Sequence, residues 1–183
     1  MSKIILATGG ARSGKSAYMQ ELAESLPGPR TFVATCPAPG GEDKEILARV
    51  ERHRQDRKDR GWQAVEEEID LKGVLEDNLG VQTVLVDCLT LWISNLMHAD
   101  TGLDEDKITF LCGELLAACR KREGTVLFVT NEVGCGIVPE NQVARKFRDL
   151  MGRCNQAMGK GVDEVIFFSC GLPLYMKKAK DKK

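Results

Sequence analysis

The sequence is poor in the residues from which several classes of site are built. It has two histidines in 183 residues, and aromatic side chains make up 5% of it. Its seven cysteines are scattered, with no C-x-x-C pair and no cysteine–histidine cluster at metal-ligand spacing. We therefore expect no zinc site, and we interpret the cysteines as reduced residues that mostly pack in the interior.

The sequence also lacks long apolar runs and an excess of either charge. No run approaches the roughly 18 apolar residues that a membrane-spanning helix needs. The first residues, "MSKIILATGG", lack the cleavage site of a signal peptide, so we expect a cytoplasmic protein. The net charge is −1, which indicates neither nucleic acid nor an acidic membrane as partner. We interpret the lysine-rich end, about 177–183, as a solvated tail.

What the sequence does have is a regular alternation of apolar runs and helical patterns. The runs predict strands at 3–8, 30–35, 81–86, 125–130 and 164–169. Apolar residues at helical spacing predict helices at about 16–25, 42–59, 69–78, 89–98, 104–122 and 141–158. Continuous apolar strands are typical of a sheet covered on both faces. We therefore predict an α/β fold with a mainly parallel central sheet flanked by helices, in a single domain of residues 1–183.

A glycine-rich turn follows the first predicted strand. Its sequence "GGARSGKS", residues 9–16, fits the phosphate-binding pattern G-x-x-x-x-G-K-[ST] and leads into a predicted helix. Glycines allow backbone N–H groups to surround phosphates, and the helix N-terminus adds positive potential. Lys15 is expected to contact the β- and γ-phosphates, and the Ser16 hydroxyl to bind Mg²⁺. The pattern predicts a nucleoside triphosphate as ligand.

An acidic residue stands where a second metal ligand is expected. Asp87 ends the apolar run "VQTVLVD". Its carboxylate is predicted to hold Mg²⁺ directly or through water. It can also cap the helix that follows, and the two roles are compatible.

Three classes of nucleotide protein fit this loop. A GTP-binding switch needs a guanine-reading N-K-x-D after a strand, which "VTNEVG" is not. Its D-x-x-G is matched in letters by residues 70–73, but these follow the polar stretch "EEEI". A nucleotide-driven motor or filament subunit usually has a longer chain. A phosphoryl-transferring enzyme that acts on a small molecule suits the length best.

The charged segment "RVERHRQDR" suggests a second reactive group. Ile46, Val50, His53 and Arg57 share one face of the predicted helix, and Arg54 lies one position round. A neutral imidazole can attack phosphorus to form a phosphoramidate, while neighbouring arginines lower its pKa and stabilise the attacked phosphate. The alternative is a surface histidine on a solvated helix. His98 has no comparable surroundings and is interpreted as structural.

These segments, with "VLVDCLTLWISNL" and "VTNEVGCGIVPENQVARKFRDLMGRCNQ", resemble a known family. It is the bifunctional adenosylcobinamide kinase / adenosylcobinamide-phosphate guanylyltransferase family of cobalamin assembly. The resemblance runs from the glycine loop almost to the C-terminus and implies a RecA-like P-loop fold and a homotrimer. It implies that a nucleoside triphosphate, ATP or GTP, phosphorylates adenosylcobinamide. GTP then transfers GMP to a histidine, and the phosphorylated corrinoid takes the GMP to give adenosylcobinamide-GDP.

The resemblance also implies roles for individual residues. His53 matches the histidine that carries GMP. The triphosphate is implied to lie on the loop made by Gly9, Gly10, Ala11, Arg12, Ser13, Gly14, Lys15 and Ser16. Further positions match residues near bound guanine nucleotide: Thr35, Arg54, Arg57, Glu66 and Asp87. Glu67 is the alternative to Glu66, because both stand in a run of three glutamates.

The segment "VTNEVG" carries a prediction that does not depend on the resemblance. It follows a predicted buried strand, so Asn131 and Glu132 are expected at the carboxyl edge of the sheet, where ligands bind in open α/β folds. We predict that this loop lines the corrinoid or nucleotide cleft. The alternative is a polar turn that only ends the strand.

Overall fold

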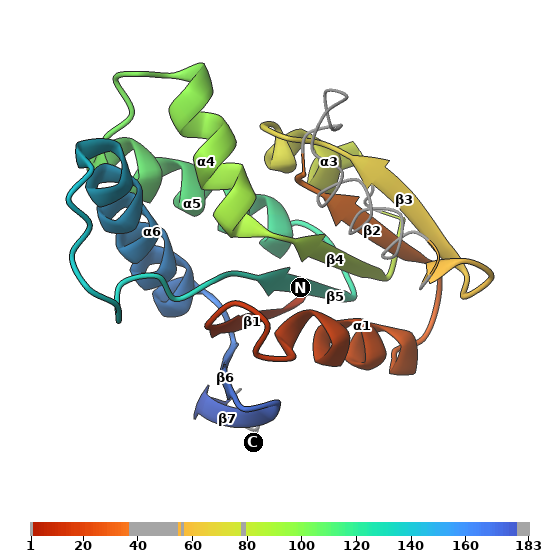
Figure 1. The fold of residues 1–183 in the computed structure, drawn as a ribbon. Coiled ribbons are helices and arrows are strands. Elements are labelled where there is room, and N and C mark those ends of the chain that lie inside the picture. Colours follow the sequence, from red (N-terminus) through yellow and green to blue (C-terminus); the bar gives the residue numbers. More distant parts are fainter. Residues whose placement is uncertain (1, 37–54, 56, 78–79, 179–183) are drawn as a thin grey trace.

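The computed structural model describes residues 2–36, 55, 57–77 and 80–178. Within them lies one seven-stranded sheet, in the order β3-β2-β4-β5-β1-β6-β7 (Figure 1). The strands are β1 (Lys3–Gly9), β2 (Arg30–Ala34), β3 (Trp62–Glu66), β4 (Thr83–Asp87), β5 (Thr125–Val129), β6 (Glu164–Ser169) and β7 (Leu172–Lys177). All neighbours pair in parallel except β6 and β7, which are antiparallel. The predicted α/β fold with a mainly parallel sheet is confirmed.

Helices cover both faces of the sheet. Helix α1 (Lys15–Ser25) packs on one face, over a core that includes Phe32, Leu85 and Leu127. The other face carries α3 (Leu71–Asp77), α4 (Leu89–Ala99), α5 (Glu105–Arg120) and α6 (Gln142–Gly161) (Figure 1). Burial on both sides explains why the central strands are continuous runs of Ile, Val, Leu and Phe rather than alternating patterns.

Side-chain caps set the starts of the two longest described helices. Asp104 accepts a hydrogen bond from the Lys107 N–H at the start of α5. Asn141 accepts from the N–H groups of Val143 and Ala144 at the start of α6. Both residues satisfy N–H groups that have no partner inside the helix. These caps lie at the first residues of the helices predicted from the sequence.

The five predicted strands are all present, and two further strands were not predicted. Both unpredicted strands, β3 and β7, lie at the edges of the sheet. Their side chains are largely exposed, so the apolar pattern that marks a buried strand is absent from β3, and β7 contains Pro173. Proline is tolerated on edge strands because the missing N–H need not join a ladder. The helix predicted at 42–59 lies almost wholly outside the described residues.

The predicted solvated tail begins later than expected. Lys177 is the last residue of β7, and its ammonium donates hydrogen bonds to the carbonyl oxygens of Gly159 (3.1 Å) and Lys160 (3.0 Å) near the end of α6. It also donates to the carbonyl oxygen of Val162. A cation is favourable there because the last carbonyls of a helix carry negative potential. Lys177 therefore belongs to the fold.

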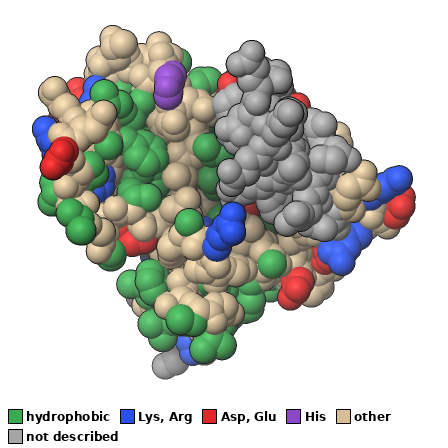
Figure 2. Space-filling model, viewed as in Figure 1, with side chains coloured by type: hydrophobic (Ala, Val, Ile, Leu, Met, Phe, Trp, Pro, Cys, Tyr) green, Lys and Arg blue, Asp and Glu red, His purple; other side chains and the backbone are tan. Residues whose placement is uncertain are grey.

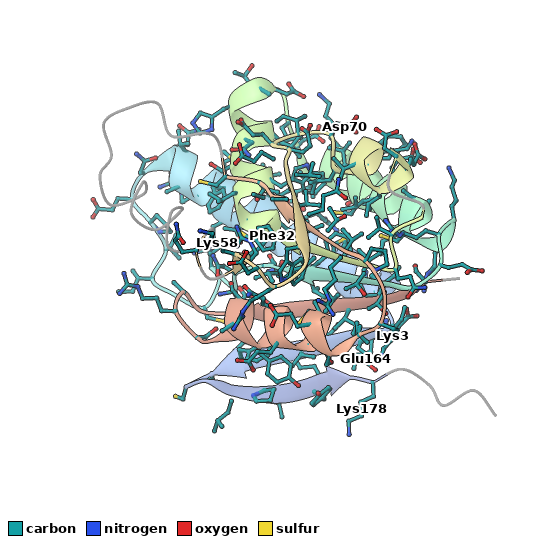
Figure 3. All side chains as sticks on the ribbon, turned by 90° about the vertical axis from the view of Figure 1, so that its right-hand side faces the viewer. Lys3, Phe32, Lys58, Asp70, Glu164 and Lys178 are labelled. Carbon is teal, nitrogen blue, oxygen red and sulfur yellow. The ribbon has the colours of Figure 1, made fainter. Side chains whose placement is uncertain are left out.

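Ion pairs stabilise the amino edge of the sheet, where the parallel strands begin. The Lys3 ammonium lies 2.9 Å from a Glu164 carboxylate oxygen, between neighbouring strands (Figure 3). Nearby, both terminal nitrogens of Arg120 donate to the Asp163 carboxylate, at 2.8 and 2.9 Å. The opposite, carboxyl edge carries the glycine loop. None of the described helices has the length and apolar character needed to cross a bilayer.

Candidate active site

The glycine loop joins β1 to α1, as the pattern predicted. Gly9 and Gly14 have φ values of 147° and 92°, which disfavour any residue with a side chain. A Cβ on Gly9 would clash with the carbonyl oxygen of Phe168, and one on Gly14 would lie 3.3 Å from the Gly171 Cα. Two glycines of the motif are therefore required both by backbone conformation and by the close approach of β6 and of the β6–β7 turn.

Lys15 lies against the inside of this loop. Its residue is 6% exposed, and its ammonium donates a hydrogen bond to the Gly10 carbonyl oxygen at 2.9 Å. The Ser13 hydroxyl is buried without a hydrogen-bond partner among the described residues. A buried ammonium and an unsatisfied hydroxyl beside helix-terminal N–H groups form a surface suited to phosphate oxygens. The half-buried Ser16 follows on the first turn of α1.

Asp87 ends β4 on the face of the sheet that carries the loop. Side chains alternate along a strand, and Leu85, two residues earlier, packs in the core under α1. The half-buried Asp87 therefore faces the same side as α1. β5 lies between β4 and β1, so the strand that ends in Asp87 is not a direct neighbour of the one that leads into the loop. This arrangement brings an acid and the glycine loop to one edge and one face.

The Thr35 side chain forms hydrogen bonds with the backbone of Cys88, the residue that follows Asp87. Its buried hydroxyl accepts from the Cys88 N–H and donates to the Cys88 carbonyl oxygen, both at 2.8 Å. The Thr35 carbonyl in turn accepts from the Asn95 side-chain amide at 2.8 Å, and that amide also donates to the Glu68 carbonyl. Burial, with the Asp87 charge, raises the pKa of the Cys88 thiol to about 11. Thr35 thus holds the chain next to the predicted metal ligand, and Cys88 stays a neutral thiol.

Arg57 lies over β2 on the α1 face of the sheet. Its guanidinium carbon is 3.6 Å from the centre of the Phe32 ring, a cation–π contact. A cavity of about 580 Å³ adjoins it, with Lys58, Trp62 and Ala64 among its lining residues. Figure 3 shows Phe32 and Lys58 at the same end of the sheet. His53 and Arg54, which the sequence predicts beside Arg57, lie outside the described residues.

The two candidate glutamates are in different surroundings. Glu66 is the last residue of β3 and is level with Ala34 of β2, which is itself level with Asp87. Residues level with one another in a parallel sheet share a face, so Glu66 and Asp87 lie on the same side. The Glu67 carboxylate instead accepts from the N–H groups of Ile69 and Asp70, at 2.7 and 2.8 Å. Glu67 is thus engaged in a local turn before α3.

The D-x-x-G letters at residues 70–73 have a local structural role. The Asp70 carboxylate accepts from the Gly73 N–H at 2.9 Å, at the start of α3. It therefore caps a helix that packs on the face opposite α1. This placement supports the interpretation of the match to a switch motif as accidental.

Asn131 and Glu132 lie at the carboxyl edge of the sheet, as predicted. The Thr130 N–H donates to the Ala7 carbonyl oxygen (2.9 Å) and the Glu132 N–H to that of Gly9 (3.0 Å). The ladder between β5 and β1 thus continues into the first residue of the glycine loop. The Glu132 carboxylate accepts from the Gly134 N–H at 2.7 Å. The segment "VTNEVG" is therefore attached directly to the loop.

The described residues do not form a metal site from protein ligands alone. No group of three or more His, Cys, Asp or Glu side chains in them could hold a metal ion. The Ser16 hydroxyl and the Asp87 carboxylate are hard oxygen donors of the kind that suits Mg²⁺, an ion usually bound by one or two protein ligands together with phosphates and water. The donor set fits Mg²⁺ in company with a triphosphate.

Fold and site together define a class of protein. A parallel sheet with helices on both faces, a G-x-x-x-x-G-K-S loop at the tip of β1 and an acid at the tip of β4 are the features of a P-loop NTPase. The comparison with known families narrows the class. Residues 5–176 match the family described as "Cobinamide kinase / cobinamide phosphate guanyltransferase", and the chain belongs to it. It is a bifunctional kinase and guanylyltransferase of cobalamin biosynthesis.

Three curated proteins are similar along nearly their whole length. Two are described as "Bifunctional adenosylcobalamin biosynthesis protein CobU": one from Escherichia coli, 37% identical over 95% of this chain and 99% of its own, and one from Salmonella typhimurium, 35% identical with the same coverage. The third, "Bifunctional adenosylcobalamin biosynthesis protein CobP" from Pseudomonas aeruginosa, is 34% identical over 94% of this chain and 96% of its own. The resemblance stated from the sequence is confirmed.

Proposed function

We propose that one glycine loop serves both reactions by holding the triphosphate while a different phosphorus atom is attacked in each. The observation that carries the proposal is the arrangement of Lys15 and Asp87. Asp87 ends β4, and Lys15 begins α1 after the loop that follows β1, at the same edge and face of the sheet; one strand, β5, lies between β4 and β1. In this proposal the buried Lys15 ammonium and the backbone N–H groups of the loop bind the β- and γ-phosphates, whichever phosphorus reacts.

In the kinase step the hydroxyl of adenosylcobinamide attacks the γ-phosphorus of ATP or GTP. Catalysis of this kind depends on positioning and on stabilising charge that spreads over the phosphoryl oxygens. Lys15 supplies positive charge, and the Ser13 hydroxyl gains the hydrogen-bond partner that it lacks among the described residues. The residues that would hold Mg²⁺ are Ser16 and Asp87. The ion would neutralise charge on the phosphates.

In the guanylyltransfer step His53 attacks the α-phosphorus of GTP and pyrophosphate leaves toward Lys15. The resulting phosphoramidate passes GMP to the phosphorylated corrinoid. Arg57 supports this proposal, because its contact with Phe32 holds a cation on the α1 face of β2, beside a cavity of about 580 Å³. We propose that Arg54, Arg57 and Glu66 surround the guanine nucleotide, and that the buried Thr35 acts through the Cys88 backbone beside Asp87. Glu66 is preferred to Glu67 because it is level with Asp87 and lies on the same face of the sheet, whereas the Glu67 carboxylate closes the turn before α3.

Labelling with GTP that carries ³²P on its α-phosphorus tests the histidine. The wild type is expected to give an acid-labile, alkali-stable protein adduct, and His53→Ala to give none while it keeps kinase activity. His98→Ala is the matched control, since His98 lies at the end of α4 with its Nδ1 2.7 Å from the Ser94 carbonyl oxygen. Full labelling of His53→Ala would remove this histidine from the mechanism.

Lys15→Ala tests whether one loop serves both steps. Both the kinase reaction and the labelling of His53 are expected to fall, because each needs the polyphosphate held in place. A variant that lost phosphorylation of cobinamide but kept normal labelling would show that the two reactions use separate nucleotide sites. The result decides between one site and two without a structure of the complex.

We also propose that the enzyme assembles as a homotrimer. The proposal rests on the family resemblance and is supported by the exposed apolar side chains of β7, where Leu172, Leu174 and Met176 are 70%, 63% and 66% exposed. Figure 2 shows hydrophobic side chains gathered over this end of the molecule. Light scattering after size-exclusion chromatography is expected to give three times the 20.2 kDa chain mass. A monomer at micromolar concentration would contradict the proposal.

A further inference from the structure

Asn131 is held by side chains from two different helices. Its N–H donates to the Thr90 hydroxyl of α4 at 2.8 Å, and its carbonyl oxygen accepts from the Asn155 side-chain amide of α6 at 3.0 Å. The other end of the Asn155 amide accepts from the Thr130 hydroxyl at 2.9 Å. Thr90 and Asn155 lie 41 and 24 residues away from Asn131 along the chain. They fix the backbone of one residue immediately after a buried strand.

The side chain of this residue lies on the face of the sheet that carries the glycine loop. Leu127 and Val129 pack in the core on the α1 face, and the ladder to β1 continues through the hydrogen bonds of Thr130 and Glu132. Alternation along this extended strand therefore puts Asn131 on the α1 face as well. Val129 is level with Ala7, so Asn131 is level with Gly9, one strand spacing of about 4.8 Å away.

The Asn131 carboxamide is available to a ligand. Asn131 is half-buried, and its side chain has no hydrogen-bond partner among the residues that the structure describes. Asn131 follows β5, which lies between β4 and β1. β4 ends in Asp87, and β1 leads into the loop in which the Lys15 ammonium contacts Gly10. A clamped backbone with an unused amide at this place has the features of a preorganised donor.

We propose that Asn131 is a catalytic residue of the kinase step, and that Thr90 and Asn155 are positioning residues that hold it. The proposal rests on the function proposed above. The Asn131 amide donates a hydrogen bond to an oxygen of the γ-phosphoryl group as it is transferred. In that step the acceptor oxygen forms a bond to the γ-phosphorus, and the bond from this phosphorus to the β–γ bridging oxygen breaks. The nucleoside diphosphate leaves with the electron pair, and the hydroxyl proton passes to water.

The two reactions should depend on this donor to different degrees. In the kinase step, charge moves across the γ-phosphoryl group, where the amide is. In the guanylyltransfer step the bond between the α-phosphorus and its bridging oxygen breaks, and charge develops on the departing pyrophosphate next to the α-position. The amide therefore contributes to the kinase transition state and much less to the labelling of His53.

The test compares both rates in matched variants. Asn131→Ala is expected to lower the kinase kcat by about 10²-fold, the usual effect of removing one such donor, with KM for the nucleotide changed by less than about 3-fold. Labelling of His53 by α-³²P-GTP should stay within about 3-fold of the wild type. Asn131→Ser is a second, smaller change in case the alanine variant is unstable. Asn141→Ala is the matched control, because the Asn141 side chain caps the start of α6.

The positioning residues are tested by conservative and disruptive pairs. Asn155→Asp keeps the acceptor for the Thr130 hydroxyl but loses the donor to the Asn131 carbonyl, so it should lower kinase kcat selectively. Thr90→Ser keeps the hydroxyl and should retain the rate that Thr90→Val loses. If Thr90 and Asn155 were purely structural, their substitution would instead lower the rates of both reactions together with the melting temperature. Thr90→Ser would then not restore the kinase rate selectively.

Each outcome decides a separate question. Wild-type kinase rates in Asn131→Ala, or an equal loss of both reactions, would overturn the role of Asn131 and leave the family's activities as they are. A wild-type protein that phosphorylates cobinamide but is not labelled would overturn the histidine mechanism, and the kinase comparison would still test Asn131.

Discussion

Asp163 is expected to stabilise the fold through an ion pair with Arg120, and the contribution can be worked out from the structure. The Asp163 carboxylate accepts two hydrogen bonds from Arg120, at 2.8 and 2.9 Å, and one from the Ile4 N–H at 2.7 Å. Arg120 also donates to the carbonyl oxygens of Ser2 and Gly161, each at 3.0 Å. The pair thus connects α5, the end of α6 and the start of β1.

The partial exposure of the pair sets the size of the effect. The side chains of Arg120 and Asp163 are 34% and 30% exposed. Exposed ion pairs contribute about 0–1 kcal/mol, and breaking a buried pair costs about 3–5 kcal/mol. Asp163→Asn, which can still accept from the Ile4 N–H, should therefore cost about 2 kcal/mol, because it loses the charge but not every hydrogen bond. For a chain of this size that is a fall of about 4–8 °C in Tm.

The effect should depend on pH in a direction that follows from the pKa. Burial alone would raise the pKa of Asp163, but hydrogen bonds from Arg120 and the Ile4 N–H, with the charges of Arg120 and Lys177, outweigh burial and hold it below 3.8. A lowered pKa in the folded state means that the stabilisation is complete above the unfolded pKa. The difference between the wild type and Asp163→Asn should be constant above about pH 5 and should shrink as the pH falls below about 4.

Urea unfolding at several pH values measures this difference. Glu76→Gln is the matched control, because Glu76 pairs with Lys121 at 3.1 Å and these side chains are 39% and 63% exposed. That change should cost less than about 0.5 kcal/mol. Equal effects of the two substitutions at pH 7, or a difference for Asp163→Asn that persists unchanged at pH 3, would refute the reasoning.

Three further predictions concern the fold. Gly124→Ala should cost at least about 2 kcal/mol in urea unfolding, because Gly124 has φ 84° and its Cβ would overlap the Gln82 backbone. Gly113→Ala, in mid-α5 where a Cβ meets nothing within 4 Å, should instead stabilise by about 0.5–1 kcal/mol, and a loss at both glycines by similar amounts would contradict the distinction. Asn141→Ala should cost about 1 kcal/mol through the lost cap of α6, whereas Asn141→Asp keeps the acceptor and should be nearly neutral by thermal unfolding. Lys177→Met should lower Tm by about 2–6 °C because three carbonyl oxygens lose their donor, and an unchanged Tm would mean that Lys177 belongs to the solvated tail.

The parts of the fold that were predictable are those in which a local pattern has one physical meaning. A continuous apolar run between turn residues marks a strand buried on both faces, and all five such strands are present. The glycine loop was predictable for the same reason, since G-x-x-x-x-G-K-S between a strand and a helix encodes its backbone conformation locally. β3 was not predicted because an edge strand is exposed and its residues need not follow an apolar pattern, and β7 was not predicted because Pro173 interrupts its apolar run.

The candidate site divides in the same way. Lys15, Ser16 and Asp87 are predicted from the sequence as phosphate and Mg²⁺ ligands, because each stands at a fixed offset from the end of a strand, and these roles stay predictions. The roles of Thr90 and Asn155 could not, since only packing of α4 and α6 against β5 brings them to Asn131. The different surroundings of Glu66 and Glu67 also needed the structure, in which Glu66 is level with Asp87 and the Glu67 carboxylate closes a turn.

The sequence by itself determined the alternation of strands and helices, the conformation of the glycine loop and the family to which the chain belongs. These features depend on residues close together along the chain, and the type of each residue sets whether it is buried and which backbone angles it adopts. Only the tertiary structure decided which strand lies between β1 and β4, which polar side chains clamp the end of that strand, and which charges pair at the opposite edge. Such contacts join distant residues, and their energies exist only once the sheet has brought those residues together.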